Sequence, residues 1–388
     1  MRGHIVKRSK DSYSIKISLG KDAITGKYKY QWVSVKGTKK EAEKKLSEIL
    51  HQIDTGLFIK PDKMILGEYL KRWLSEYARP NLSPRSYERY ESIVRVHLLP
   101  SIGNIVLTQL KPEHLQKHYS TKLNDGLSPL SVRYHHTVIH KALQTALKWG
   151  LLNRNAASGT DAPRAGHNEM QIWDDFEIRR FLEVAKDSQY FALFHTALFS
   201  GMRRNELLGL RWSDIDFLFS QVSISRSIHH LRDGSFVFTQ PKTAKSKRTI
   251  ALSPASIQTL TDHKAKQTAI MRAVNKTLTD NDLVFCHLDG RPLRPNTISR
   301  AWSMLAAKAG LNIIRLHDAR HTHASILLKQ GVNPKVVQER LGHASIQITL
   351  DIYSHVTPGL QKAAIEQFDN LVSPKYNIES EKAVIEKH

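Results

Sequence analysis

The pattern of apolar residues changes twice along this chain, and each change limits what the segment can fold into. Residues 1–57 contain runs with near period-2 alternation, such as SYSIKISLG and KYKYQWVSV, and then a helical segment that Thr38 and Glu41 mark as a capping box. Residues 63–151 contain helical segments separated by Pro and Gly. From residue 169 onward, helices precede and follow a group of short strands. A chain of 388 residues with these patterns requires more than one hydrophobic core.

We therefore predict a multidomain α+β fold. Its N-terminal domain combines a small three-stranded β-sheet with one helix, and its second domain contains four helices. The third domain is mainly α-helical and has a small antiparallel sheet formed by QVSISRSI, SFVFTQ and KRTIAL, of which the last two are joined by the basic hairpin PKTAKSK. Residues 152–168 are rich in Gly, Ala and Asn and are predicted to be a linker. Residues 375–388 form a short charged tail.

The charge balance favours a polyanionic partner. The chain has 58 Lys and Arg residues against 36 Asp and Glu residues, which gives a net charge of +22. A field of this sign favours nucleic acid, because Lys and Arg contacts to phosphates release counterions. In residues 1–57, basic and aromatic side chains alternate on the predicted strands. This alternation suits a β-sheet that reads a DNA groove, and it equally suits a solvated charged surface.

Two features of the sequence indicate the cellular compartment in which the protein works. Cys286 is the only cysteine, so an intramolecular disulfide and a cysteine-based metal site are excluded. The N-terminus, MRGHIVKRSK, has no apolar signal-peptide core, and no uninterrupted apolar run reaches 18 residues. We therefore expect a soluble, cytoplasmic protein with no membrane partner.

The stretch LHDARHTHAS concentrates three histidines and one arginine within seven positions. His317 and Arg320 are three residues apart, so a helix places them on one face. His317 and His321 have a spacing that suits zinc, but the metalloprotease pattern has Glu directly after the first histidine, where this chain has Asp318. An anion site is therefore favoured over a metal site. We assign His323 to helix packing or to the helix surface.

Further candidate residues lie upstream and downstream of this stretch. FSGMRRNELLGL places Arg203 and Arg204 where a short helix begins. The helix N-terminus and a guanidinium can then bind a phosphate together. Glu206, three residues after Arg203, could orient it. In RLGHASIQITLDIYSHV, His343 follows a glycine and Tyr353 lies near a helix end. Tyr353 is a candidate nucleophile, because a phenol can attack phosphorus and become a phosphotyrosine.

Together these residues match an ordered motif. The residue types along the chain are Arg, Lys, His-x-x-Arg, His and Tyr, and the last two are ten positions apart. In this order the chain resembles the tyrosine recombinase family of site-specific DNA integrases, of the phage and conjugative-element type. The resemblance covers residues 169–366 closely and residues 63–151 by helical pattern, and residues 1–57 look like the arm-type DNA-binding domain of such integrases. All six motif positions match: Arg203, Lys242, His317, Arg320, His343 and Tyr353.

The resemblance implies a domain arrangement and a reaction. Residues 63–151 would be a helical core-binding domain of SAM-like fold, residues 169–366 the catalytic domain, and residues 375–388 a tail that docks on a neighbouring subunit. Tyr353 would attack the scissile phosphodiester and hold the DNA as a 3′-phosphotyrosine, which the 5′-hydroxyl of a second strand then reverses. This reaction retains the phosphodiester energy, so it needs no nucleotide cofactor, and no metal is expected.

The other five motif residues have implied roles in the same reaction. Arg203 and Arg320 would counter the negative charge of the pentacoordinate transition state, since a guanidinium donates in a planar fork. His343 would donate to a nonbridging oxygen. Lys242, on the basic hairpin, would protonate the departing 5′-oxygen. His317 would exchange a proton with the nucleophile, because imidazole titrates near the working pH.

The implied partner is double-stranded DNA at attachment sites, bound by a homotetramer, with an excision factor and a host DNA-bending protein as additional partners. The enzyme would serve a prophage or another mobile element and act on the nucleoid of a bacterial host.

Three alternatives to an integrase are a Xer-like chromosome dimer recombinase, a non-cutting DNA-binding regulator and a type IB topoisomerase. A metal nuclease based on DID (214–216) and DND (280–282) is disfavoured, because these segments have the character of turns. By the same family pattern, His321 would orient the neighbouring arginine.

Overall fold

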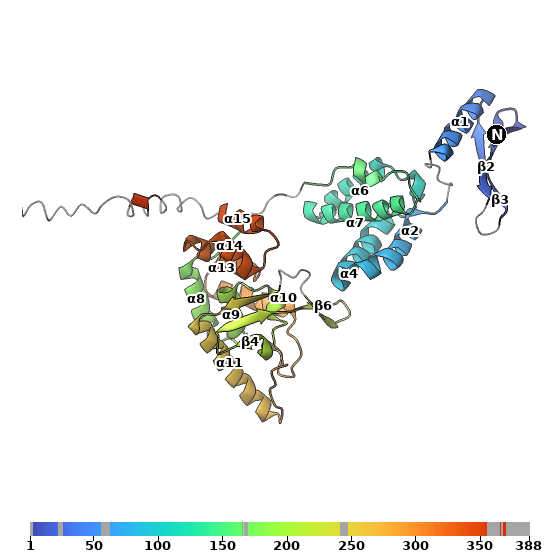
Figure 1. Ribbon diagram of the computed structural model, residues 1–388. Helices are drawn as coiled ribbons and strands as arrows, with labels where there is room; N and C mark the ends of the chain where they lie inside the picture. Colours follow the sequence, from blue (N-terminus) through green and yellow to red (C-terminus); the bar gives the residue numbers. More distant parts are fainter. Residues whose placement is uncertain are drawn as a thin grey trace, which may run out of the picture. The chain divides into compact units, whose positions relative to one another are not determined.

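The computed structural model describes residues 3–21, 26–55, 63–164, 170–240 and 247–354, together with residues 166, 365, 368 and 369. The chain divides into two compact units, Met1–His167 and Asn168–His388 (Figure 1). Within the described ranges, no helix is both long enough and apolar enough to cross a membrane.

A three-stranded antiparallel sheet and one helix form the first part of the chain, as predicted. The strands lie in the order β1-β2-β3, and α1 packs on one face, where Ile15, its cross-strand partner Val33 and Ile49 contribute to a small apolar core. The predicted capping box is present, since Glu41 N donates to Thr38 Oγ1 and Thr38 N donates to Glu41 Oε2. The elements are β1 (Gly3–Ser9), β2 (Ser12–Lys21), β3 (Tyr28–Lys36) and α1 (Lys39–Asp54).

The opposite face of this sheet carries aromatic and cationic side chains. Strand alternation turns one set of β3 residues away from α1, and these side chains are each about half exposed: Tyr28, Tyr30 and Trp32. Lys16 Nζ lies 4.2 Å from the centroid of the Tyr30 ring, and the Arg8 guanidinium lies 5.5 Å from that of Trp32. The face therefore offers flat rings and positive charges side by side.

Four helical segments follow, as predicted, and π-helical turns lengthen the first two. Tyr69 Oη donates to Ala142 O (2.6 Å) and Trp73 Nε1 donates to Thr145 Oγ1 (3.1 Å), so the first segment is tied to the last. Ser83 caps the second segment, as expected. The elements are α2 (Leu66–Trp73), a π-turn (Leu74–Ala78), α3 (Arg79–Asn81), α4 (Pro84–Ile93), a π-turn (Val94–Leu98), α5 (Leu99–Ile102), α6 (Pro112–Asn124) and α7 (Pro129–Lys148).

A group of buried histidines lies between α5, α6 and α7. His118 Nε2 and His135 Nδ1 are 3.3 Å apart, and His118 Nδ1 lies 2.8 Å from Ser101 Oγ. The ring of His97 stacks on that of His135, with 4.5 Å between centroids. Burial lowers the pKa of both His118 and His135 to about 4, so both rings are neutral at pH 7.

We expect the unfolding free energy of this helical part to fall as the pH drops from 6.5 towards 4. In the unfolded chain the two histidines have ordinary pKa values near 6.5, so the unfolded state binds protons in this window while the folded state does not. One such histidine costs about 2 kcal/mol between pH 7 and pH 5. Amide hydrogen exchange in α6 and α7, corrected for intrinsic rates, measures the loss. His135→Gln should flatten the dependence, and equal stability of the unsubstituted protein at both pH values would contradict it.

The second unit is mainly helical and has small antiparallel sheets. Its elements are α8 (Asp175–Ala185), α9 (Phe191–Ser200), α10 (Arg204–Leu207), β4 (Ile215–Asp216), β5 (Gln221–Ile224), β6 (Ser227–His230), β7 (Phe236–Thr239), β8 (Arg248–Ala251), α11 (Pro254–Ala273), α12 (Pro295–Lys308), α13 (Asp318–Lys329), α14 (Pro334–Leu341) and α15 (Ile346–Ser354).

An aromatic core holds the helices of this unit together. The Trp302 ring lies 4.4 Å from Phe181 and 4.9 Å from Trp173, measured between centroids, and Phe194 contacts it edge-on. Trp302 Nε1 also donates to Ile314 O (2.9 Å). This core joins α8, α9 and α12 and fixes the segment that leads into α13.

The strands of the second unit pair differently from the prediction. The predicted strand QVSISRSI is two strands, because Ser225 and Arg226 turn to bind the carboxylate of Asp214. β5 pairs with β4 and β8, whereas β6 pairs with β7 through a tight turn at Gly234, whose φ is +86°. The predicted hairpin between SFVFTQ and KRTIAL is therefore wrong, because β7 and β8 belong to different sheets. The multidomain α+β class itself is confirmed.

Candidate active site

Arg203 is positioned by a glycine turn and by a carboxylate. α9 ends at Gly201, which has a φ of +64°, and Arg203 is the N-cap of α10. Arg203 Nη1 lies 2.8 Å from Glu206 Oε1, and Arg203 N donates to Glu206 Oε2. Arg203 Nη2 donates to Gly342 O (2.9 Å). The sequence-based interpretation that Glu206 orients Arg203 is confirmed, whereas Arg204 donates to Ser299 Oγ.

Glu206 also binds a second guanidinium that the sequence analysis missed. Arg248 on β8 donates from Nη2 to Glu206 Oε2 (2.9 Å) and from Nη1 to Glu206 Oε1 (3.2 Å). Burial alone would raise the pKa of Glu206, but the bonds and charges of Arg248 and Arg203 hold it below its ordinary value. The sequence contains a signal for this contact. Arg248 and the buried Ile250 are two positions apart on one strand, so the Arg248 side chain points to the same apolar face as Ile250.

Arg320 lies in the first turn of α13 and is buried. Its Nη1 donates to Gly201 O (2.9 Å) and its Nη2 to Leu341 O, so it bridges the ends of α9 and α14. Burial and the neighbouring charge of Arg203 lower the pKa of Arg320 to about 9, which leaves it protonated at pH 7. Arg203 and Arg320 are therefore brought together as two cations.

His343 directly follows the turn at Leu341 and Gly342, whose carbonyls accept hydrogen bonds from Arg320 and Arg203. Gly342 has a φ of +66°, a backbone conformation that favours glycine, and a Cβ there would also crowd the Arg248 guanidinium at 3.0 Å. His343 is buried, and its Nδ1 lies 2.9 Å from Thr349 Oγ1 on α15. Burial, followed by the charges of Arg320 and Arg203, lowers the pKa of His343 to about 3. The imidazole is therefore neutral at pH 7.

His317 is the N-cap of α13 and is exposed at the edge of the site. Partial burial of the ring, followed by the charges of His321 and Arg320, lowers its pKa to about 4. The rings of His317 and His321 are perpendicular, with 5.3 Å between centroids. His323 is buried and accepts from Arg340 Nε, so its role is packing.

Two of the six predicted residues are described in part or not at all. Lys242 lies outside the described residues. Tyr353 lies in α15, of which the backbone is described at this position. The structure therefore brings Arg203, Arg320 and His343 together and places His317 beside Arg320. Among the described residues, no group of three or more His, Cys, Asp or Glu side chains could hold a metal ion.

The arrangement has more fixed positive charge than negative charge. Arg203 and Arg248 bind the carboxylate of Glu206, and the guanidinium of Arg320 is held by backbone carbonyls close enough to feel its charge. Pre-oriented cations stabilise a developing anion strongly, because little reorganisation is needed when the charge appears. The site therefore suits a phosphate group that gains negative charge in its transition state.

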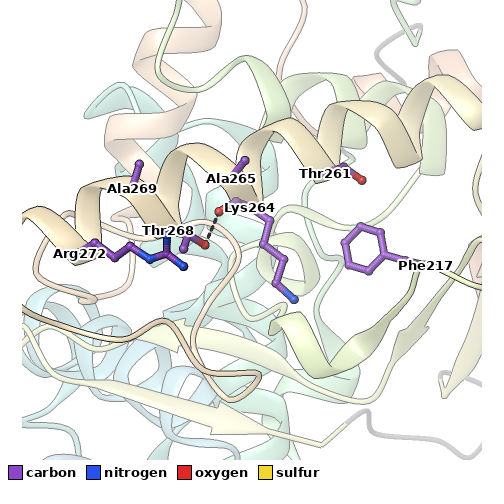
Figure 2. A pocket seen from close by; sticks show the side chains of 7 residues that line it. All are labelled: Phe217, Thr261, Lys264, Ala265, Thr268, Ala269 and Arg272. Atoms are coloured by element: carbon purple, nitrogen blue, oxygen red, sulfur yellow. Dashed lines mark hydrogen bonds between the residues drawn. The ribbon is translucent and has the colours of Figure 1, made fainter.

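A separate hollow lies along α11. Its volume is about 560 Å³, and Phe217, Lys264 and Arg272 are among the residues that line it (Figure 2). Lys264 Nζ lies 5.5 Å from the centroid of the Phe217 ring. None of the predicted motif residues lines this hollow, so it is distinct from the candidate active site.

Comparison with known sequences identifies the family. The profile of the phage integrase family matches residues 172–359, and that of the phage integrase N-terminal SAM-like domain matches residues 65–123. The chain belongs to the phage integrase family of tyrosine recombinases. Such enzymes cut and rejoin DNA, which confirms the function and enzyme class predicted from the motif. DNA is accordingly its substrate.

Individual relatives agree with this family assignment. The tyrosine recombinase XerC-like protein of Caldanaerobacter subterraneus is 29% identical over 384 residues, which cover 94% of this chain and 98% of the relative. The ICEBs1 integrase of Bacillus subtilis is 26% identical and covers 95% of this chain and 100% of the relative. Further relatives bear the name integrase, including that of Staphylococcus phage L54a. The integrase assignment is thus favoured over the Xer-like, regulator and topoisomerase alternatives.

Solved structures show the same fold. The Tn1549 transposon integrase in complex with circular intermediate DNA gives a TM-score of 0.67 at 18% identity, covering 79% of this chain and 99% of that one. The lambda integrase tetramer bound to a Holliday junction gives a TM-score of 0.57 at 16% identity, covering 90% and 94%. At these identities the likeness concerns the fold of the integrases.

Proposed function

We propose that this recombinase integrates and excises a mobile element or prophage through a covalent 3′-phosphotyrosine at Tyr353. The other catalytic residues are Arg203, Lys242, His317, Arg320 and His343. One observation carries the proposal: Arg203 and Arg320 donate to the carbonyls of Gly342 and Leu341, the two residues directly before His343, so all three side chains meet at one turn. This constellation supports the binding of one phosphodiester by two guanidiniums and one neutral imidazole.

The protonation states support specific roles in the reaction. Arg203 and Arg320 are cations at pH 7 and offset the charge of the pentacoordinate phosphorane. His317 has a lowered pKa of about 4, so its ring is neutral at pH 7 and can accept a hydrogen bond from the Tyr353 phenol. The proton passes to His317 only as the phenol oxygen bonds to phosphorus, because that bond makes the O–H group strongly acidic. Lys242 delivers a proton to the departing 5′-oxygen. The phosphodiester energy passes to the phosphotyrosine and back, so the proposal invokes no metal and no nucleotide cofactor.

We further propose a division of labour between domains. Residues 1–57 bind arm-type DNA sites, residues 63–151 bind the core site, and residues 169–366 carry the catalysis. The aromatic and cationic face formed by Tyr30, Trp32 and neighbouring cations supports the first role, because flat rings and Lys side chains suit a DNA groove. A homotetramer acts at two attachment sites in the cytoplasm of a bacterial host, on the nucleoid, with an excision factor and a host DNA-bending protein.

The proposed function is tested by strand exchange between DNA fragments that carry the two ends of the element and its insertion site. We expect recombinant products, together with a protein–DNA adduct that survives denaturation, to form in the presence of a metal chelator. Relaxation of supercoiled DNA without exchange between sites would favour topoisomerase activity instead. Tight DNA binding with neither adduct nor products would support a non-cutting regulator.

Residues 375–388 are proposed to dock on a neighbouring subunit. Deleting them should leave the cleavage of a single site unchanged and weaken the assembly of two sites into one complex. Native gel electrophoresis of the protein with paired DNA sites measures this assembly. An unchanged yield of the paired complex would rule out the docking role.

A further inference from the structure

Thr349 contacts the candidate active site from the helix that contains Tyr353. Its side chain has no exposed surface, and its Oγ1 lies 2.9 Å from Nδ1 of His343, which is also buried. Within the described part of the chain, His343 Nδ1 is the one side-chain partner found for this hydroxyl. Thr349 lies in α15, and Tyr353 follows it by four residues, or about one helical turn.

The main chain of His343 is held from a different helix. His343 N donates to Gln338 O (3.1 Å), and Gln338 Nε2 donates to His343 O (3.2 Å). Arg203 and Arg320 donate to the carbonyls of the two preceding residues, Gly342 and Leu341. The backbone of this turn is therefore fixed by α14 and by the arginines, whereas the ring of His343 is fixed by α15.

A neutral imidazole has one N–H group, so its two nitrogens cannot both donate. If Nδ1 carries the proton, Nε2 is only an acceptor, and it repels the oxygen of a phosphate. If Nδ1 accepts a hydrogen bond, the proton is on Nε2, which can then donate. A hydroxyl group that donates to Nδ1 selects the second form. The buried state of His343 and the cations beside it keep the ring neutral, so this choice matters at pH 7.

We propose that Thr349 is a positioning residue that donates to His343 Nδ1, holds the Nε2–H tautomer towards the scissile phosphate and ties α15 to the phosphate-binding turn. This inference rests on the proposed function, because it requires that His343 donates to a DNA phosphate. The helix that contains the nucleophile is thereby connected to the group that binds the phosphorus centre. Thr349 acts through His343 and touches no reacting atom.

The test is the single-turnover rate of adduct formation on a DNA site with a nick beside the scissile phosphate, so that religation is blocked. Thr349→Val keeps the shape of the side chain and removes the donor, and we expect cleavage to slow about tenfold at unchanged DNA affinity. Thr349→Ser keeps the hydroxyl and should remain within about threefold of the parent protein. Thr349→Ala is a second variant without a donor, and the unfolding midpoints of all variants identify any that lose the fold.

A double-mutant cycle separates positioning from a general structural role. In a His343→Ala background, Thr349→Val should cause no further slowing, because the residue through which it acts is gone. Equal slowing by Thr349→Val in both backgrounds would overturn the inference, and so would a Thr349→Val rate equal to that of the parent. In either case, adduct formation by the parent would still support the proposed function. If the parent forms no adduct, or if Tyr353→Phe still forms one, the proposed function fails and the inference fails with it.

Discussion

The Tyr353→Phe variant is expected to bind its DNA sites as tightly as the parent protein and to form no covalent adduct with them. The substitution removes one oxygen atom, which is the proposed nucleophile, and retains the aromatic ring. Without a covalent intermediate, neither strand exchange nor relaxation can proceed, so the loss should be complete within detection. Denaturing gels of labelled DNA, run beside a DNA-affinity measurement, provide both readouts.

A matched control for this variant is Tyr190→Phe. Tyr190 belongs to the same unit and packs against Phe194, with 6.0 Å between ring centroids. It is partly buried against the aromatic core and is not among the predicted site residues, so its variant should form the adduct at close to the parent rate. An adduct formed at the parent rate by Tyr353→Phe would mean that another residue attacks the DNA.

Arg320→Lys is expected to reduce the rate of cleavage by about 10²–10³-fold, which corresponds to about 3–4 kcal/mol of transition-state stabilisation. The guanidinium of Arg320 bridges two carbonyls, those of Gly201 and Leu341, from a buried position. An ammonium retains the charge but lacks the planar fork, so it cannot satisfy both carbonyls and also face a phosphate. Single-turnover cleavage at saturating DNA measures the effect.

The same variant should also be less stable, because one buried carbonyl loses its partner at a cost of about 1–3 kcal/mol. Cleavage is therefore measured well below the unfolding midpoint of the variant. Arg179→Lys is the control, since Arg179 is exposed on α8 and pairs only with Asp175 among the contacts described for it. Its variant should match the parent in rate and midpoint. A rate for Arg320→Lys within about threefold of the parent would contradict the proposed phosphate site.

Local spacing was sufficient to predict much of the site. Arg203 and Glu206 are one helical turn apart at a helix start, so their ion pair follows from the sequence alone. The capping residues Thr38 and Ser83 were predicted for the same reason, because a cap depends on neighbours within four residues. The order of the six motif residues then indicated the family without any knowledge of the fold.

Long-range contacts could not be predicted in this way. Arg248 reaches Glu206 across 42 positions, and Thr349 meets His343 only because the turn at Gly342 folds α15 back onto the site. The predicted hairpin failed because the carboxylate of Asp214 interrupts the strand after Ile224, which changes the pairing of every later strand. Alternation of side chains indicates a strand, but it does not reveal the partner of that strand.

The most direct test of the proposed mechanism is to identify the residue that carries the DNA. The adduct is trapped on nicked DNA, the nucleic acid is trimmed with nuclease, and the protein is cleaved with trypsin for mass spectrometry. Cleavage after Arg340 and Lys362 releases residues 341–362, which contain Tyr353 as their only tyrosine. We predict that the residual nucleotide is attached to this peptide at Tyr353. Attachment to any other residue would contradict the proposed mechanism.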